Sequence, residues 1–478
     1  MKKYEKQFIG GEWREGCSDS VLENKNPYTG QSIYSYRAAG EKDIDDAYAS
    51  AEEAQAEWSQ TSPAQKQAAM ERLAGAISEM SDEVHACLAE EGGSAKAKRD
   101  FEFHTSIEIV KSAMQFPLMM DGKIMPSNIP GKDNYIFKSP RGVIGVIAPW
   151  NVPLVLAMRS VLPAVATGNS VVLKPATDTP GSAFLIADFF ERAGMPKGLL
   201  SVIAGKGSEI GDYIVDHPVP SLISFTGSTE VGRRIGSRAS GLLKEISLEL
   251  GGNNVMIVLS DADIEKAAKA AAFGAFFHQG QVCMALNRII ILNDKYDMFA
   301  EAFAEETKKL IVGDPSDPET FIGPIINKAQ IESIEGYIEA TKLAGAKVLL
   351  EGRTDGSLIH PWLFTEVSND MPAAEHEVFG PVCCLIRAGS EQEAVAAAND
   401  TKYGLSGSIF TSDLYHGMQT AKLIQSGMVH VNDQSINDEP HVMFGGEKES
   451  GIGRFNAQWV VDKFTSQKWI SVQSQHRF

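Results

Sequence analysis

The sequence has few cysteines and no long apolar run. Its 478 residues contain five cysteines, which form neither a disulfide framework nor a Cys-x-x-Cys metal motif: Cys17, Cys87, Cys283, Cys383 and Cys384. We therefore expect no metal site and a reducing, cytoplasmic compartment. The first residues lack the apolar core of a secretory signal. The most apolar stretch, residues 143–158, is interrupted by Pro149 and Pro153, so we expect no membrane span.

Basic residues are also in the minority. Lys and Arg number 44 against 62 Asp and Glu, which gives a formal net charge of −18. Since there is no basic run either, we expect no nucleic-acid partner. Hydrophobic residues make up 43% and charged residues 22% of the chain, which excludes a disordered or collagen-like protein. The length predicts about three domains at roughly 150 residues each.

Apolar strands and helices alternate from residue 142 onward. Strands are expected first over 143–148, 170–173, 199–203 and 222–225, and helices over 154–166, 180–193, 208–215 and 229–239. After Gly251-Gly252 a second series of strands is expected over 254–259, 288–292, 347–350, 384–387, 408–410 and 428–431. The alternation predicts an α/β fold with two doubly wound parallel sheets, which bind ligands at the carboxyl ends of their strands.

The remaining segments have other patterns. Residues 43–116 are expected to be helical, and the first 40 or so to wrap onto a later domain. Turn residues within 119–138 favour extended strands in a hairpin arm, and the tail after residue 459 is less regular.

Two glycine-containing segments suggest phosphate binding. Phe225-Thr-Gly-Ser-Thr-Glu-Val-Gly232 leads from a strand into a helix, whose free N–H groups suit a phosphate; a capped helix after a tight turn is the alternative. Gly205-Lys-Gly207-Ser-Glu-Ile-Gly211 nearly matches the dinucleotide fingerprint, but its last glycine comes one residue late. By itself, this second segment is better explained as a turn before a helix.

Three side chains suit nucleophilic chemistry. Cys283 follows a glycine-containing turn, and a nucleophilic cysteine needs access and a stabilised thiolate. Glu249 at a strand end suits a general base, and Asn151 at another suits a donor to an oxyanion. The alternatives are a buried inert cysteine, a solvated glutamate and a helix-capping asparagine.

Taken together, seven segments in order resemble the aldehyde dehydrogenase superfamily. They are Pro149-Trp-Asn151, Lys174-Pro175, Phe225-Thr-Gly-Ser228, Glu249-Leu-Gly-Gly252, Gly280-Gln-Val-Cys283, Glu377-Val-Phe-Gly-Pro381, and Phe444-Gly-Gly446 with Ser450-Gly451. The resemblance extends over essentially the whole chain. The segments Met158-Arg-Ser160 and Ile436-Asn-Asp-Glu-Pro-His441 are similar to those of aromatic aldehyde dehydrogenases of the benzaldehyde or vanillin type.

The resemblance implies a role for each matching residue. Cys283 is the implied nucleophile, Glu249 the base that activates the hydrolytic water, and Asn151 with the Cys283 backbone N–H the oxyanion hole. The implied contacts of the coenzyme, NAD or NADP, are Trp150, Lys174, Thr177, Gly207, Gly227, Ser228, Gly232, Glu377 and Phe379. The implied substrate contacts are Val152, Leu156, Arg159, Met284 and Phe444.

The family's organisation is expected as well. It implies a cofactor-binding domain (1–117 and 139–250), a catalytic domain (251–435), an oligomerisation arm (118–138 and 460–478) and a return segment lining the active site (436–459). The expected assembly is a homodimer or homotetramer. The expected reaction is NAD(P)-dependent oxidation of an aldehyde to the carboxylic acid through a thiohemiacetal and a thioester. A semialdehyde dehydrogenase with an aliphatic acidic substrate and a silent binding protein are the alternatives.

Four positions carry finer expectations. Phe455 stands where the family often has Glu, which favours an apolar site, with plain packing as the alternative. Arg159 either meets a ring hydroxyl or carboxylate of the substrate or forms a structural salt bridge. Thr177 stands where NAD-preferring relatives commonly have Glu, so both coenzymes are expected to bind. Asp178 is expected to point away, and an inward Asp178 would restore the preference for NAD. Cys283 is expected to be an exposed, low-pKa thiolate that alkylation selects over the other cysteines.

Overall fold

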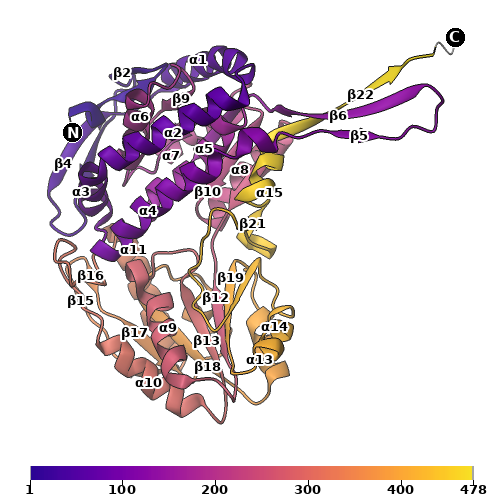
Figure 1. Ribbon diagram of the computed structural model, residues 1–478. Coiled ribbons are helices and arrows are strands. Elements are labelled where there is room, and N and C mark those ends of the chain that lie inside the picture. The colour runs from indigo at the N-terminus through magenta and orange to yellow at the C-terminus, as the bar shows by residue number, and fades with distance from the viewer. Residues whose placement is uncertain (1, 476–478) are drawn as a thin grey trace.

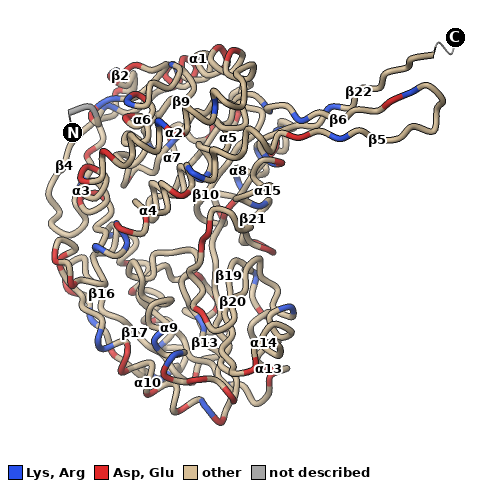
Figure 2. Tube along the Cα trace, viewed as in Figure 1, with Lys and Arg blue, Asp and Glu red and all other residues tan. Residues whose placement is uncertain are grey.

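A computed structural model describes residues 2–475 and contains two large, mainly parallel sheets. They form the upper and lower parts of the molecule in Figure 1. Acidic and basic residues are interspersed along both parts (Figure 2). None of the helices within residues 2–475 is both long enough and apolar enough to cross a membrane.

The first sheet has the strand order β2-β1-β9-β8-β7-β10-β11-β21. Its five central strands are parallel: β7 (Val143–Ile147), β8 (Ser170–Lys174), β9 (Leu200–Val202), β10 (Leu222–Thr226) and β11 (Glu245–Glu249). The short strands β1 (Gln7–Ile9), β2 (Glu12–Arg14) and β21 (Gly451–Ile452) add antiparallel edges. The chain moves outward from β7 to β9 and then returns to β10 on the other side of β7. The strand order therefore reverses between β7 and β10, where open α/β sheets bind ligands.

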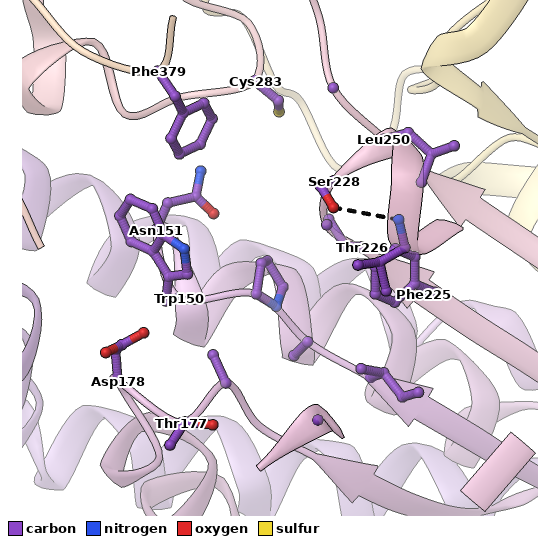
Figure 3. A pocket seen from close by; sticks show the side chains of 18 of the residues that line it. Trp150, Asn151, Thr177, Asp178, Phe225, Thr226, Ser228, Leu250, Cys283 and Phe379 are labelled. Carbon is purple, nitrogen blue, oxygen red and sulfur yellow. Dashed lines mark hydrogen bonds between the residues drawn. The ribbon is translucent and has the colours of Figure 1, made fainter. Parts of the chain in front are cut away.

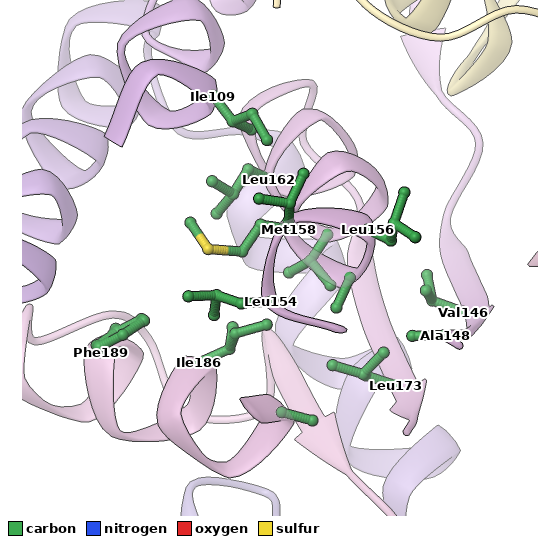
Figure 4. Close-up of a cluster of buried hydrophobic side chains, with 14 of the residues drawn as sticks. Ile109, Val146, Ala148, Leu154, Leu156, Met158, Leu162, Leu173, Ile186 and Phe189 are labelled. Carbon is green, nitrogen blue, oxygen red and sulfur yellow. The ribbon is translucent and has the colours of Figure 1, made fainter. Parts of the chain in front are cut away.

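Helices cover both faces of this sheet because its strands are apolar on both sides. Val143 and Ile147 of β7 pack toward α1 (Glu41–Ser59), α7 (Gly207–Asp216) and α8 (Thr229–Gly241). Ile144 and Val146 pack in the cluster of α5 (Pro153–Ala166) and α6 (Gly181–Arg192), which Figure 4 shows. Outside these lie α2 (Pro63–Glu79), α3 (Ser81–Gly92) and α4 (Lys96–Ala113). Each fully buried aliphatic side chain contributes about 1.5–3 kcal/mol.

The second sheet has the order β14-β17-β18-β13-β12-β19-β20. Its strands are β12 (Asn254–Val258), β13 (Leu286–Leu292), β14 (Lys347–Leu350), β17 (Trp362–Thr365), β18 (Val382–Ala388), β19 (Ser406–Phe410) and β20 (Met428–Val431). On one face lie α9 (Ile264–Phe276) and α10 (Tyr296–Lys308), and on the other α11 (Lys328–Leu343), α12 (Pro372–Glu375) and α13 (Glu391–Asn399). The helix α14 (Leu414–Ala421) packs beside β19 and β20.

An arm of three antiparallel strands projects from the body (Figure 1). It consists of β5 (Lys123–Met125), β6 (Lys132–Pro140) and β22 (Thr465–Gln473), with β6 in the middle. Two small hairpins lie apart from these sheets: β3 (Val21–Lys25) with β4 (Ser32–Arg37), and β15 (Thr354–Asp355) with β16 (Leu358–Ile359).

The predicted fold class is confirmed, and each strand and helix predicted within the two series is present, with ends shifted by at most two residues. Residues 43–116 are helical as expected, and β1 joins the first sheet through the pair Phe8 and Val202.

Three details of the fold differ from expectation. The strand β14 is antiparallel to β17, because only a small hairpin and no crossover helix joins them. The arm strand β6 continues to Pro140, and residues 460–463 belong to helix α15 (Ala457–Lys463) rather than to the arm. Residues 476–478 of the predicted arm lie outside the described residues. The functional division into cofactor-binding domain, catalytic domain, arm and return segment stays a prediction.

Candidate active site

A cavity of about 690 Å³ lies between the two sheets. One wall comes from residues at the carboxyl ends of β7, β8 and β10, and the other from segments that lead into β13 and β18. Figure 3 shows Trp150, Thr177 and Asp178 on one side, with Cys283 and Phe379 opposite. The volume lies within the range of small-molecule and cofactor sites.

Most of the predicted site residues line this cavity. They are Trp150, Asn151, Leu156, Lys174, Thr177, Gly207, Gly227, Ser228, Cys283, Glu377 and Phe379. The others lie outside its lining. Among them are four of the five predicted substrate contacts, Val152, Arg159, Met284 and Phe444, which are buried. Gly232 packs beneath Leu250, where a Cβ atom would come within 2.2 Å of a leucine methyl, so its location does not support a coenzyme contact.

The turn that carries Cys283 has an unusual backbone. His278, Gln279 and Gly280 all have positive φ angles, of 52°, 57° and 71°. Only glycine fits at 280, because a Cβ there would lie 2.4 Å from the carbonyl oxygen of Gly380. The Gln279 side chain fixes the turn, since it donates to Pro324 O (2.9 Å) and accepts from the N–H of Gly323 (3.0 Å). The cost of the positive φ values is thus met by buried hydrogen bonds.

Asn151 lies next to this turn. It follows strand β7, and its Nδ2 donates to the carbonyl oxygen of Gln281 at 3.0 Å, two residues before Cys283. The second Nδ2 hydrogen is therefore available to a ligand. The backbone N–H of Cys283 donates to no acceptor within residues 2–475. The two predicted oxyanion donors thus lie on adjoining segments.

A buried ion pair on α4 supports the Asn151 loop. Glu102 accepts from Leu154 N (3.0 Å) and Val155 N (3.4 Å), so it caps the helix that begins after Asn151. Its other oxygen accepts from Lys98, and both side chains are fully buried. Burial, and after it the charge of Lys98, lowers the pKa of His278 in the Cys283 turn well below its usual value. No catalytic or binding motif in the sequence contains this pair, although Lys and Glu four residues apart on a helix are an available signal.

Glu249 ends strand β11 and is 4% exposed. Neither carboxylate oxygen has a hydrogen-bond partner within the described chain. Burial raises the pKa of Glu249 to about 8, and the nearby Arg159 and Arg454 oppose that rise. A carboxyl group with a pKa near neutrality suits a general base. The alternative of a solvated glutamate in a turn is wrong.

The expectation of an exposed, low-pKa Cys283 thiol is wrong for this arrangement. Cys283 is half-buried, whereas Cys17 is exposed. Burial raises the pKa of the Cys283 thiol to about 12, and Glu377 and Glu249 add to the rise while Arg159 opposes it. Exposure therefore does not favour Cys283 in alkylation, and the thiol needs a proton acceptor before it can attack.

The opposite end of the cavity suits a dinucleotide. A Cβ atom on Gly227 would lie 2.5 Å from the ring of Phe225, so only glycine fits between this ring and the cavity. Ser228 caps α8 by accepting from Val231 N at 3.4 Å, and the helix N-terminus attracts anions. Lys174 is buried and donates to Pro175 O at 2.8 Å; burial lowers its pKa to about 8. An anionic or hydroxyl-rich ligand satisfies this ammonium group.

The position of Asp178 differs from the expectation that its side chain points away. Thr177 and Asp178 both line the cavity, and Figure 3 shows the Asp178 carboxyl group between Thr177 and Trp150. Asp178 therefore does not point away. Burial raises its pKa, and a hydrogen bond with Asn327 opposes the rise.

Glu377 and Phe379 close the wall that belongs to the second sheet. Glu377 accepts from the N–H of Gly252 at 3.0 Å, and a Cβ on Gly251 would lie 2.2 Å from its other oxygen. The Gly-Gly pair thus permits a close contact that a side chain would prevent. The rings of Phe379 and Trp150 meet edge to face across the cavity, 5.4 Å between centroids.

The packing of two residues agrees with one of the alternatives open for each. Arg159 forms an ion pair with Asp438, and both side chains are buried, which is the salt-bridge alternative. Phe455 is 1% exposed and pairs with Phe444 through backbone hydrogen bonds of 2.8 and 3.2 Å, which is the packing alternative.

Comparison with known proteins agrees with this fold. The model of the aldehyde dehydrogenase family matches residues 13–470. The chain belongs to the aldehyde dehydrogenase family, whose members are oxidoreductases. It is 47% identical to a vanillin dehydrogenase of Corynebacterium glutamicum over 471 residues, covering 98% of this chain and 97% of that protein. It is also 47% identical to a benzaldehyde dehydrogenase of Bacillus subtilis over 481 residues, covering 100% and 99%.

A solved structure supports the same assignment. The crystal structure of an NAD-dependent benzaldehyde dehydrogenase from Corynebacterium glutamicum matches with a TM-score of 0.91 and 44% identity. The match covers 98% of both chains.

Proposed function

We propose that this chain oxidises aromatic aldehydes, of the benzaldehyde or vanillin type, to carboxylic acids with NAD. The observation that carries the proposal is the meeting of Cys283, Asn151 and the Cys283 N–H at one end of a cavity sized for a dinucleotide and a small substrate. Similarity to vanillin and benzaldehyde dehydrogenases supports the substrate class, and similarity to an NAD-dependent enzyme supports the coenzyme.

In the first chemical step the Cys283 sulfur attacks the aldehyde carbon. A C–S bond forms as the S–H bond breaks, the thiol proton passes to solvent water in the cavity, and the carbonyl π electron pair moves onto oxygen. The free Nδ2 hydrogen of Asn151 and the Cys283 backbone N–H donate to that oxyanion. When bound, NAD supplies the acceptor for the hydride that the tetrahedral carbon then loses. The sulfur is left as a thioester.

In the second step Glu249 takes a proton from water as the water oxygen attacks the thioester carbon. The C–S bond breaks, the carboxylic acid leaves and the thiolate is restored. The buried carboxyl group with a pKa of about 8 can accept this proton and release it again. Because the ionised form is needed, we expect hydrolysis to become faster as the pH rises toward 8.

The chain's own residues provide the coenzyme site. Gly227 and the α8 N-terminus with Ser228 suit the diphosphate, and Lys174 suits the adenosine ribose. Trp150, Glu377 and Phe379 surround the nicotinamide end. Asp178 adds a carboxyl group beside Thr177, which disfavours the extra phosphate of NADP.

An assay that follows the absorbance of NADH over a panel of aldehydes tests the proposal. Benzaldehyde and vanillin should have a higher kcat/KM than acetaldehyde or succinic semialdehyde, since a ring buries more apolar area at about 25 cal/mol per Å². An acidic aliphatic substrate needs a free cation, and the candidate Arg159 is paired with Asp438. Preference for succinic semialdehyde would overturn the aromatic assignment.

We also propose that the chain is a homo-oligomer formed through the arm. Apolar side chains of the arm are exposed on β5, β6 and β22: Ile124, Met125, Phe137, Trp469, Ile470 and Val472. An exposed apolar surface of this kind marks an interface. Light scattering should give a molar mass of two or four chains, and the substitution Trp469→Glu should lower it.

A further inference from the structure

The surroundings of Glu249 contain a buried ion pair that the chemical steps above do not use. Arg159 on α5 and Asp438 in the segment after β20 have side chains only 4% and 3% exposed. Arg159 Nη2 donates to one Asp438 oxygen, and Asn456 Nδ2 donates to the other at 3.2 Å. The guanidinium carbon lies 4.0 Å from the centroid of the Phe444 ring. The pair is therefore fixed from several sides.

Phe444 and the residue after it, Gly445, connect this pair to Glu249. A Cβ atom on Gly445, the next residue, would lie 3.0 Å from Glu249 Oε1, so the backbone here packs directly on the carboxyl group. Phe444 therefore contacts the guanidinium group on one side and leads into the residue that covers Glu249.

The unsatisfied polar atoms of this region complement each other. Nε and Nη1 of Arg159 are buried donors without a partner, and both oxygens of Glu249 are buried acceptors without a partner in the described chain. Arg454, the other cation near Glu249, already donates to the carbonyl oxygens of Gly446 and Gly453 at 2.8 Å. Arg159 is thus the cation with donors to spare.

The charges that act on Glu249 come from three parts of the chain. Arg159 on α5 and Arg454 after β21 favour its ionised form, and Asp438 opposes them. Cys283, on the turn before β13, is subject to the same Arg159 and Asp438 charges and to Glu249 itself.

We propose that Arg159 and Asp438 are positioning residues for Glu249: Arg159 stabilises the carboxylate that activates the hydrolytic water, and Asp438 limits the positive charge that this carboxylate experiences. The proposal rests on the function proposed above. It assigns the pair to thioester hydrolysis rather than to binding of the aromatic ring.

The proposal predicts that two charge variants shift the pH profile of the hydrolysis-limited rate in opposite directions. Arg159→Met removes the positive charge and should move the midpoint of the hydrolysis-limited rate upward by about one pH unit. Asp438→Asn leaves Arg159 unopposed and should move the midpoint downward. A structural ion pair predicts loss of stability in both variants and no opposite shift. Arg159→Lys keeps the charge and should stay near the wild-type midpoint.

A matched control and a second readout complete the test. Arg14→Met breaks the Arg14–Asp43 pair, whose acid is also buried but lies at α1 on the other face of the sheet, and should not move the midpoint. Infrared titration of the Glu249 carboxyl group, with Glu249→Gln as reference, measures the same pKa without turnover. If Arg159→Met does not fold, Asp438→Asn and Arg159→Lys still show whether the midpoint of the hydrolysis-limited rate moves in the predicted direction.

Two results overturn the proposal. One is a midpoint that moves the same way, or not at all, in both charge variants. The other is an unshifted midpoint with a raised KM for hydroxylated benzaldehydes alone, which would make Arg159 a substrate contact. Failure of the proposed function is a separate result, because the wild-type protein would then reduce no NAD with any aldehyde.

Discussion

The substitution Glu249→Gln is expected to make the protein more stable at alkaline pH while it removes hydrolysis. Burial raises the pKa of Glu249 from 4.5 to about 8, so the folded state binds this proton more tightly than the unfolded state does. The stabilisation from this proton is complete below pH 4.5 and is lost as the pH rises through 8. At about 1.4 kcal/mol per pKa unit, the loss is about 3 kcal/mol at pH 7 and about 5 kcal/mol above pH 8.

A glutamine has no such loss, because it stays neutral at every pH. Its buried amide costs a pH-independent amount of about 1–3 kcal/mol if it lacks a partner. The test therefore compares the stability of Glu249→Gln with that of the wild type at each pH. The difference between the two proteins should change with pH. The melting temperature of the variant relative to wild type should rise by several degrees between pH 5 and pH 8.5.

Thermal melts at matched ionic strength measure this difference. The control is Glu245→Gln, which removes an exposed carboxyl group from the same strand; the expected trend is one that Glu249→Gln alone shows. A flat difference for Glu249→Gln would mean that this carboxyl group ionises as it does in the unfolded chain, and the electrostatic reasoning would be wrong.

The same variant separates the two chemical steps. Glu249→Gln should still release NADH in a burst near one equivalent per active subunit and then turn over slowly, because the thioester accumulates. In the wild type the ionised fraction rises from about a tenth at pH 7 to about nine tenths at pH 9. The hydrolysis-limited rate should therefore rise close to tenfold over this range, as stopped-flow and steady-state assays will show.

Four further substitutions test other parts of the site. Cys283→Ala should abolish aldehyde oxidation but leave NAD affinity, measured by calorimetry, near that of wild type. Asp178→Asn should raise kcat/KM with NADP at least tenfold relative to NAD, within a bound of about 4 kcal/mol for a charge pair at about 4 Å; an unchanged ratio would exclude Asp178 as the selectivity element. Glu102→Ala leaves Lys98 buried and unpaired, so the free energy of unfolding in urea should fall by about 3–5 kcal/mol, whereas replacing both residues by apolar ones should cost less. Gly280→Ala should give little soluble, active enzyme, because its Cβ would lie 2.4 Å from a carbonyl oxygen; normal activity would contradict the assigned turn geometry.

Several strands could be predicted because they are nearly continuous apolar runs, such as residues 143–148 and 170–173. Asn151 and Lys174 come after these two runs, whereas Glu249 ends a strand in which polar and apolar residues alternate. The structure places all three near the carboxyl edge of one sheet. Their roles came from the resemblance, because a strand end does not distinguish a base from a solvated glutamate. Strand β14 was given the wrong direction because an apolar run has the same pattern in either orientation.

The electrostatics of the site could not be predicted from the sequence. Arg159 and Asp438 are 279 positions apart, and nothing near either residue indicates the other. The pKa values of Glu249 and Cys283 depend on burial and on charges from several elements, which only the folded chain brings together. The direction of the Asp178 side chain depends on the loop after β8, where alternation along a strand no longer applies.

The projecting arm has a consequence for the order in which the protein forms. Its central strand β6 pairs with β22, and contacts such as that between Asn134 and Trp469 join residues 335 positions apart. During synthesis on the ribosome, β6 emerges long before β22 exists, so one edge of β6 stays unpaired while the second sheet is made. The edge strand β21, which pairs with β11, also comes late in the chain. The nascent protein therefore passes through a long stage that is prone to aggregation, and chaperones that cover open strand edges should act mainly at that stage.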